Sequence, residues 1–141
     1  MDKFFEVCAR VFIIKDGKIL LCKRKEGDYF FFPGGHIDFS EQAEEALIRE
    51  IQEEIGKPLS DLSFIGANEN YFNQNGDEHH EFNLVFSGVI PDGEVVALED
   101  YLDFQWVDLN SLETENIQPV ALRNELKNWL SEKKNFWTSQ F

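Results

Sequence analysis

The chain has 141 residues, a formal net charge of −14 and 43% hydrophobic residues. This length and apolar content fit a single domain, residues 1–141, with a core of its own. A chain this acidic is repelled by nucleic-acid phosphates, which argues against DNA or RNA polymers as partners, whereas a bound metal ion would still allow a small phosphorylated ligand.

Cysteine usage and hydropathy indicate the compartment. Cys8 and Cys22 each stand in an apolar, strand-like run, with no metal-type spacing between them. They are interpreted as reduced core residues in a reducing environment. No apolar run approaches membrane-spanning length, and the first residues show no signal-peptide pattern. A cytoplasmic protein without a membrane partner is therefore expected.

The N-terminal part of the chain is predicted to be a hairpin followed by a short strand. Residues 4–14 are rich in Phe, Val and Ile and are predicted to form a strand, Asp16-Gly17 is a two-residue turn signal, and residues 19–23 are predicted to be the return strand. The aromatic run at residues 29–32 predicts a further strand, because the following proline favours an extended backbone.

A glycine pair and a helix follow. Gly34 and Gly35 are expected to end the strand and to let the backbone approach a ligand closely. Ser40 is the predicted N-cap of a helix that runs to about Ile55, with Gly56 as the C-terminal stop. The apolar stripe of this helix is predicted to comprise Leu47, Ile48, Ile51 and Ile55.

The second half is predicted to contain three strands and one helix. Residues 62–72 and 81–89 read as strands joined through an Asn75-Gly76 turn, and residues 104–107 as a short third strand. A helix is expected over residues 119–130.

The tail, residues 133–141, has no clear pattern, although Phe136 and Trp137 could dock on the domain or on a partner subunit. The order of strands, helix, strands and helix predicts a mixed sheet with helices packed on its faces, in the α/β or α+β range.

The first predicted helix carries an unusual acidic face. Glu50, Glu53 and Glu54 are spaced i, i+3 and i+4, so they share one side of the helix and repel one another unless a cation lies among them. Oxygen ligands of this kind suit Mg²⁺ or Mn²⁺, which commonly accompany phosphate substrates. A Glu-rich face can also be merely solvated, so these three residues alone do not define a site.

The surrounding residues favour the metal site. The spacing G-x5-E-x7-R-E-U-x-E-E-x-G, where U is apolar, is matched by Gly35, Glu41, Arg49, Glu50, Ile51, Glu53, Glu54 and Gly56. This stretch resembles the signature of the Nudix hydrolase superfamily, which continues with one further apolar residue. Lys57 departs from the final apolar position, which affects local packing more than chemistry.

The resemblance implies a fold, a cofactor and residue roles. The fold would be the α/β/α sandwich of a MutT-like, single-domain member with a mixed β-sheet. Mg²⁺ or Mn²⁺ would be held by Glu50, Glu53, Glu54 and the carbonyl of Gly35. Arg49 would hold a helix glutamate in position. Glu41 and Gly34 would be supporting residues.

The general base and the substrate contacts are less defined. Glu53 or Glu54 could take the proton, and some relatives use a downstream loop carboxylate instead, for which Glu99 and Asp100 lie in a comparable place. Glu81, next to His79 and His80, is another option. Arg24 is the leading candidate for a terminal phosphate, with Arg10 as a weaker one. The candidates for stacking on a base are Phe30, Phe32, Tyr71 and Phe72, of which Phe30 and Tyr71 are preferred.

The resemblance implies a Mg²⁺-dependent hydrolase that cleaves the pyrophosphate of a nucleoside diphosphate linked to another moiety. A small nucleotide would be the partner, and a homodimer is common in such families. The compact length resembles that of members that remove non-standard nucleoside triphosphates. The alternative is a Nudix-like domain that binds a nucleotide as a sensor without cleaving it, but such a module should have lost metal ligands, and none is lost here.

Overall fold

The computed structural model describes residues 1–141, and seven strands and two α-helices make up most of it. The strands are β1 (Lys3–Lys15), β2 (Lys18–Arg24), β3 (Gly34–His36), β4 (Ser60–Gln74), β5 (Asp77–Val89), β6 (Leu102–Asp108) and β7 (Phe136–Gln140). The helices are α1 (Ala43–Ile55), the 3-10 helix η1 (Leu109–Thr114) and α2 (Val120–Glu132).

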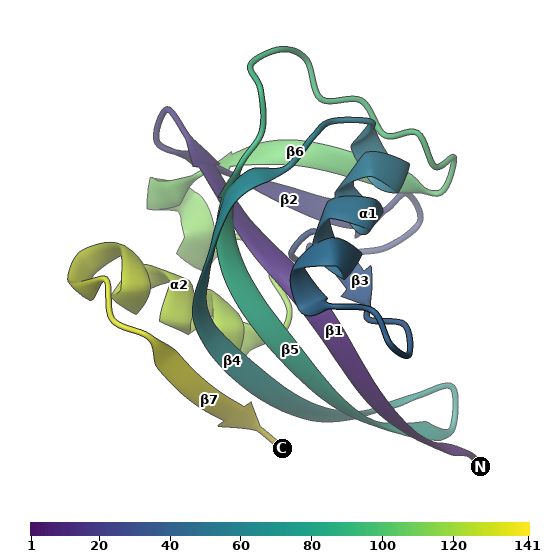
Figure 1. Cartoon of the computed structure of the whole chain (residues 1–141). Coiled ribbons are helices and arrows are strands. Elements are labelled where there is room, and N and C mark those ends of the chain that lie inside the picture. The colour runs from purple at the N-terminus through teal and green to yellow at the C-terminus, as the bar shows by residue number, and fades with distance from the viewer.

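All the strands belong to one mixed sheet in the order β6-β2-β1-β5-β4-β7, with β3 paired to β1 beside the main path. β1 runs parallel to β5, and β4 parallel to β7, while the other pairs are antiparallel. The helices α1 and α2 cover opposite faces of this sheet (Figure 1). The α/β/α sandwich with a mixed sheet is thus confirmed.

Each helix closes its own half of the hydrophobic core. Alternate residues of β1 supply both halves, because successive side chains of a strand point to opposite faces. Val11 and Ile13 pack with the α1 residues Leu47 and Ile51. Phe12 packs on the other face, in the cluster that includes Leu122 and Leu126 of α2.

Both predicted tight turns are present. Asp16 and Gly17 have φ values of 53° and 77°, and Asn75 and Gly76 have 54° and 88°. Two consecutive positive φ values belong to the turn type that matches the twist of a two-residue hairpin. The strands on either side agree with the predicted ones to within a few residues.

The predicted strand at residues 29–32 is wrong. Phe31 and Phe30 form only isolated bridges, to Cys22 and Ile117 respectively. The two bridges lead to different partners, and Pro33 has no N–H to continue a ladder. The regular strand here is β3, which begins at Gly34, so the glycine pair starts a strand and does not end one.

Two details of the first helix also differ from prediction. The N-cap is Gln42, not Ser40, and Ser40 has a φ of 65° in the turn before the helix. That turn is closed by the Glu41 N–H, which donates to the carbonyl of Asp38. Ile48, predicted in the apolar stripe, is 42% exposed. Gly56 ends the helix with a φ of 67°, as predicted.

The tail forms the edge strand β7, which sequence reasoning left open. Phe136 packs against the α2-side core, whereas Trp137 is 59% exposed. Gly66 on β4 makes this docking possible, because a Cβ there would lie 2.6 Å from the Phe136 ring. No helix is long and apolar enough to cross a membrane.

Burial predicts different costs for two isoleucines of α1. Ile51→Ala should lower the free energy of unfolding by about 2–5 kcal/mol, because Ile51 has no exposed surface and the truncation leaves a cavity. Ile48→Ala, one turn away and exposed, should cost less than about 1 kcal/mol. Urea unfolding of both variants measures the difference in their free energies of unfolding. Equal losses would contradict the burial of Ile51 and the exposure of Ile48.

Candidate active site

The acidic face of α1 packs against β3 at a point where a side chain would not fit. Gly35 pairs with Ala9 of β1, and a Cβ on Gly35 would lie 2.6 Å from the carboxyl carbon of Glu50. Any other residue at position 35 would push this carboxylate away. The glycine therefore brings a backbone strand within reach of the helix carboxylates.

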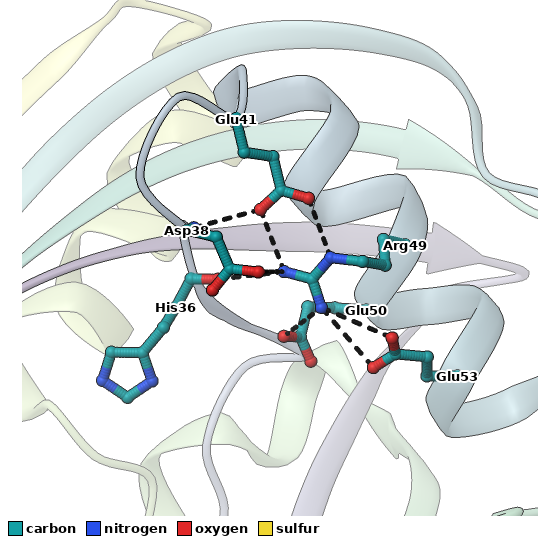
Figure 2. Close-up of polar contacts among 6 residues, drawn as sticks. All are labelled: His36, Asp38, Glu41, Arg49, Glu50 and Glu53. Atoms are coloured by element: carbon teal, nitrogen blue, oxygen red, sulfur yellow. Dashed lines mark hydrogen bonds and ion pairs between the residues drawn. The ribbon is translucent and has the colours of Figure 1, made fainter.

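Arg49 is the centre of the polar contacts at this site (Figure 2). Its Nε donates to Glu41 at 2.8 Å, and its other nitrogens lie 3.0 Å from Glu50 Oε1 and 3.5 Å from Glu53 Oε1. It also donates to the carbonyl of His36 at 3.3 Å. The hydrogen bonds from Arg49 hold the pKa of Glu41 down to about 2. Arg49 thus links the loop before α1 to two glutamates of the acidic face.

Glu54 is the most unusual member of the cluster. It is only 6% exposed, and its Oε1 is buried without a hydrogen-bond partner. Burial, and next the negative charge of Glu50, raise the pKa of Glu54 to about 8. Burial also raises the pKa of Glu50. A buried, unpaired carboxylate is costly, so this position needs either a proton or a cation.

The carboxylates do not surround a common point in this conformation. No three acidic, histidine or cysteine side chains converge closely enough to hold a metal ion. Glu50 and Glu53 are turned toward Arg49, while Glu54 lies beneath them without a partner. The donor set nevertheless fits Mg²⁺ or Mn²⁺ chemically, because it consists of carboxylate oxygens and the Gly35 carbonyl, and one buried oxygen has no other partner.

A loop after β5 brings further groups to the cluster. The Leu98 N–H donates to the backbone carbonyl of Glu54 at 2.8 Å, which holds the loop across the end of α1. Because Leu98 is hydrogen-bonded to Glu54, the next residue, Glu99, lies at the end of α1, and its negative charge contributes to the raised pKa of Glu54. Burial and the charges of Glu99 and Glu54 raise the pKa of Tyr101. The predicted residue Glu99 is thus brought to the carboxylates.

A cavity of about 440 Å³ opens beside Arg24. The Arg24 guanidinium stacks 5.8 Å from the ring centre of Tyr101. The lining residues are Arg24, Lys25, Glu26, Gly27, Asp100 and Tyr101. The two cations, Arg24 and Lys25, could contact an anion, although Glu26 and Asp100 balance their charge in the same lining.

Two predicted substrate contacts lie elsewhere. Phe30 is 8% exposed and packs in the α2-side core, so little of its ring is available to a base. Tyr71 pairs with His80, which pairs with Phe5 of β1. Phe5 is four residues from Ala9, the register partner of Gly35, or about 13 Å along the strand. The structure does not bring Tyr71 to the carboxylates.

Sequence reasoning missed a second polar group on the other face of the sheet. Asn68 and Asn83 are buried there beside Arg10, which was only a weak candidate, and Glu81, which had been considered as a base. Asn68 and Asn70, and Glu81 and Asn83, are spaced by two residues in strands. That period of polar residues was the available signal, since it places them on one face.

Comparison with known proteins agrees with this fold. A family model of the NUDIX domain matches residues 5–130. The chain belongs to the Nudix hydrolase family, and its acidic helix is the helix of the family signature.

Individual relatives differ in length and in what they act on. The chain is 38% identical over 104 residues to an ADP-ribose pyrophosphatase of Methanocaldococcus jannaschii, covering 71% of this chain and 60% of that protein. It is 27% identical to the NAD-capped RNA hydrolase NudC of Pseudomonas aeruginosa, covering 87% of this chain and 43% of NudC. It is 32% identical to the nucleoside triphosphatase NudI of Escherichia coli, covering 82% and 89%. The chain therefore spans less than two thirds of the first two relatives.

Solved structures show the same architecture. A MutT NUDIX hydrolase from Burkholderia pseudomallei superposes with a TM-score of 0.73 at 28% identity, covering 86% of this chain and 97% of that one. A mutator MutT protein from Bacillus halodurans gives a TM-score of 0.78 at 16% identity, covering 96% and 90%, which shows the fold alone.

The raised pKa of Glu54 predicts a pH dependence of stability without metal. The folded state keeps this proton up to about pH 8, whereas the unfolded chain releases it near the ordinary value of 4.5. Rising pH between these values therefore destabilises the folded state, at roughly 1.4 kcal/mol per pH unit at the steepest. In EDTA, the free energy of unfolding measured with urea should fall more steeply from pH 5 to pH 8 for the wild type than for Glu54→Gln. Parallel curves would contradict the burial of an ionisable Glu54.

Proposed function

We propose that the protein is a Mg²⁺-dependent Nudix hydrolase that cleaves the pyrophosphate of a nucleoside diphosphate linked to another moiety. The observation that carries the proposal is the buried Glu54 oxygen without a partner, next to two further carboxylates and a glycine carbonyl. A stable fold would not retain such a group without a use for it, because it costs free energy in the absence of a cation.

Glu50, Glu53, Glu54 and the Gly35 carbonyl would hold the metal. When bound, Mg²⁺ or Mn²⁺ neutralises phosphoryl oxygens and lowers the pKa of a water molecule. Arg49 would keep Glu50 and Glu53 on the same side of α1, with Glu41 as its anchor on the preceding loop. Gly34 would let β3 lie close to β1, since a Cβ at Gly34 would collide with the Ala9 carbonyl at 2.0 Å.

Glu99 is the proposed general base. It lies near Glu54 on the loop that crosses the end of α1. Its backbone carbonyl accepts from the Leu102 N–H at 3.2 Å, whereas its carboxylate makes no hydrogen bond or ion pair. Glu53 is the second choice, because its carboxylate is already in contact with Arg49 at 3.5 Å. Arg24 would bind the phosphate farthest from the nucleoside, at the cavity that it shares with Tyr101.

The substrate class follows from what the relatives share. ADP-ribose pyrophosphatase, nucleoside triphosphatase and NAD-capped RNA hydrolase are the names of proteins similar to this chain, and each name implies a nucleotide with a phosphoanhydride. A small nucleotide is therefore the proposed partner. A sensor that binds without cleavage is the alternative, and the complete set of carboxylates argues against it.

Loss of one carboxylate should abolish turnover while the fold persists. Glu54→Gln keeps the size of the side chain and removes its charge, so hydrolysis should fall at least about a hundredfold, as for removal of one key electrostatic group. The control is Glu45→Gln, on an exposed position of the same helix. Phosphate-product release from a panel of triphosphates, ADP-ribose and nucleotide sugars measures both. An active Glu54→Gln protein would exclude the cluster from the mechanism, and binding without turnover by the wild type would favour the sensor.

Mg²⁺ should raise the melting temperature, because an ion that binds only the folded state stabilises it. The increase should depend on the Mg²⁺ concentration and should be much smaller in Gly35→Ala, whose added methyl group displaces Glu50. Thermal unfolding over a millimolar Mg²⁺ titration measures this. Equal shifts in the wild type and in Gly35→Ala would show that the ion binds elsewhere.

A further inference from the structure

A row of hydrogen-bonded polar side chains crosses the α2-facing side of the sheet. Arg10 lies on β1, Asn83 on β5 and Asn68 on β4, and the two asparagines are neighbours in register. Arg10 Nε donates to Asn83 Oδ1 at 3.2 Å, and Asn83 Nδ2 donates to Asn68 Oδ1 at 3.1 Å. Asn83 Nδ2 also donates to Glu81 Oε1 at 2.9 Å. Asn68 and Asn83 are 0% and 1% exposed.

The chemistry of Arg10 sets the direction of every hydrogen bond in this row. A guanidinium only donates, so Asn83 must present its oxygen to Arg10 and its nitrogen to the other partners. Asn68 in turn must present its oxygen to Asn83. The amide orientations, which are otherwise interchangeable, are therefore fixed by one charged residue.

This order leaves one donor and one acceptor free, on the two residues that accept from Asn83. Asn68 Nδ2 is buried without a hydrogen-bond partner. Glu81 is half-buried, and only its Oε1 is engaged. An unpaired buried amide N–H is destabilising, because it has lost its hydrogen bonds to water without gaining another partner. A ligand that offers a carbonyl oxygen and an adjacent N–H would satisfy both groups.

The row is connected to the candidate active site through Arg10. Its NH1 donates to the Phe32 carbonyl at 3.1 Å, and Arg10 pairs in register with Gly34. Its positive charge also acts on Glu50 and Glu54. Asn68 lies two strands away from β1, which is about 10 Å. Because α1 and the row lie on opposite faces of the sheet, a nucleotide with its phosphates at the carboxylates would have to extend around β3, the strand that pairs with Arg10, for its base to reach the row.

We propose that Asn68 and Glu81 recognise the lactam edge of a nucleobase, an adjacent C=O and N–H, with Arg10 and Asn83 orienting them. The proposal rests on the proposed function and specifies its substrate class. Guanine, hypoxanthine and uracil carry this edge, whereas adenine and cytosine have an amino group in place of the carbonyl and an unprotonated ring nitrogen beside it. The amide N–H would donate to the carbonyl oxygen, and the Glu81 carboxylate would accept from the ring N–H.

Entry of the base requires a local adjustment, because Asn68 has no exposed surface. Asn68 neighbours β7, a five-residue strand at the edge of the sheet, where it pairs in register with Thr138. Changes of side-chain rotamer are common at binding interfaces.

The test is the equilibrium binding of nucleoside monophosphates, which requires no turnover. Dissociation constants of GMP, IMP, UMP, AMP and CMP are measured by calorimetry in EDTA. We expect at least about tenfold tighter binding of the lactam bases, the equivalent of one discriminating hydrogen bond. Comparing the dissociation constants of GMP and IMP with that of UMP shows whether the site prefers purines or pyrimidines.

Two variants show whether the preference belongs to this row. Glu81→Gln should weaken the binding of GMP, IMP and UMP and leave the binding of AMP and CMP unchanged. The preference for lactam bases should therefore fall to within about threefold. Glu69→Gln is the matched control, because Glu69 is also half-buried in the sheet but bonds to His80 and Ser139 away from the row. It should keep the wild-type preference.

Each other outcome overturns the inference. The row would be structural if the wild type bound all five nucleotides equally or bound none of them. It would also be structural if Glu81→Gln weakened the binding of every nucleotide by the same factor. Hydrolysis of a substrate panel with Mg²⁺ is measured separately. Hydrolysis without base preference leaves the proposed function intact, whereas base preference without hydrolysis overturns the proposed function alone.

Discussion

The repulsion among the carboxylates of α1 is the constraint on which the site depends. Three glutamates on one helix face oppose folding, and Arg49 offsets part of this repulsion by contacting two of them and Glu41. The compensation is incomplete, because Glu54 is left buried and without a partner. The other interactions of the fold offset this remaining unfavourable electrostatic free energy, and a bound divalent cation would remove it.

The scaffold explains how such a cost is tolerated. α1 is anchored by Leu47 and Ile51, both fully buried against the sheet, so the acidic face is held in place from behind. On the side of α1 that faces β3, Gly35 allows this strand to approach Glu50. The carboxylates are therefore confined between a packed core and a backbone strand, which limits how far they can move apart.

Much of this was predictable because it depends on local rules. The turns at Asp16-Gly17 and Asn75-Gly76, the end of α1 at Gly56 and the shared face of Glu50, Glu53 and Glu54 follow from backbone preferences and helical spacing. Non-local features were not predictable. Phe30 looked like a strand residue, but its partner Ile117 is distant in sequence. Ser40 was a good cap by type, but the turn held by Glu41 moved the cap to Gln42. The Arg10 row combines three strands, and no single segment reveals it.

The pairing of β1 with β5 also has a consequence for how the chain folds. Residues 3–13 of β1 form a parallel ladder with residues 78–88, and β7 adds a second parallel ladder to β4 from a segment some seventy residues later in the chain. Contacts this far apart in sequence carry a large loop-closure cost, so folding should be slow for a chain of this size. During synthesis, β2 and β3 become available soon after β1, but the edge of β1 that pairs with β5 must remain unpaired until β5 emerges. The exposed Phe4, Phe5 and Val7 of β1 would meanwhile favour association with other nascent chains, which makes early chaperone binding advantageous.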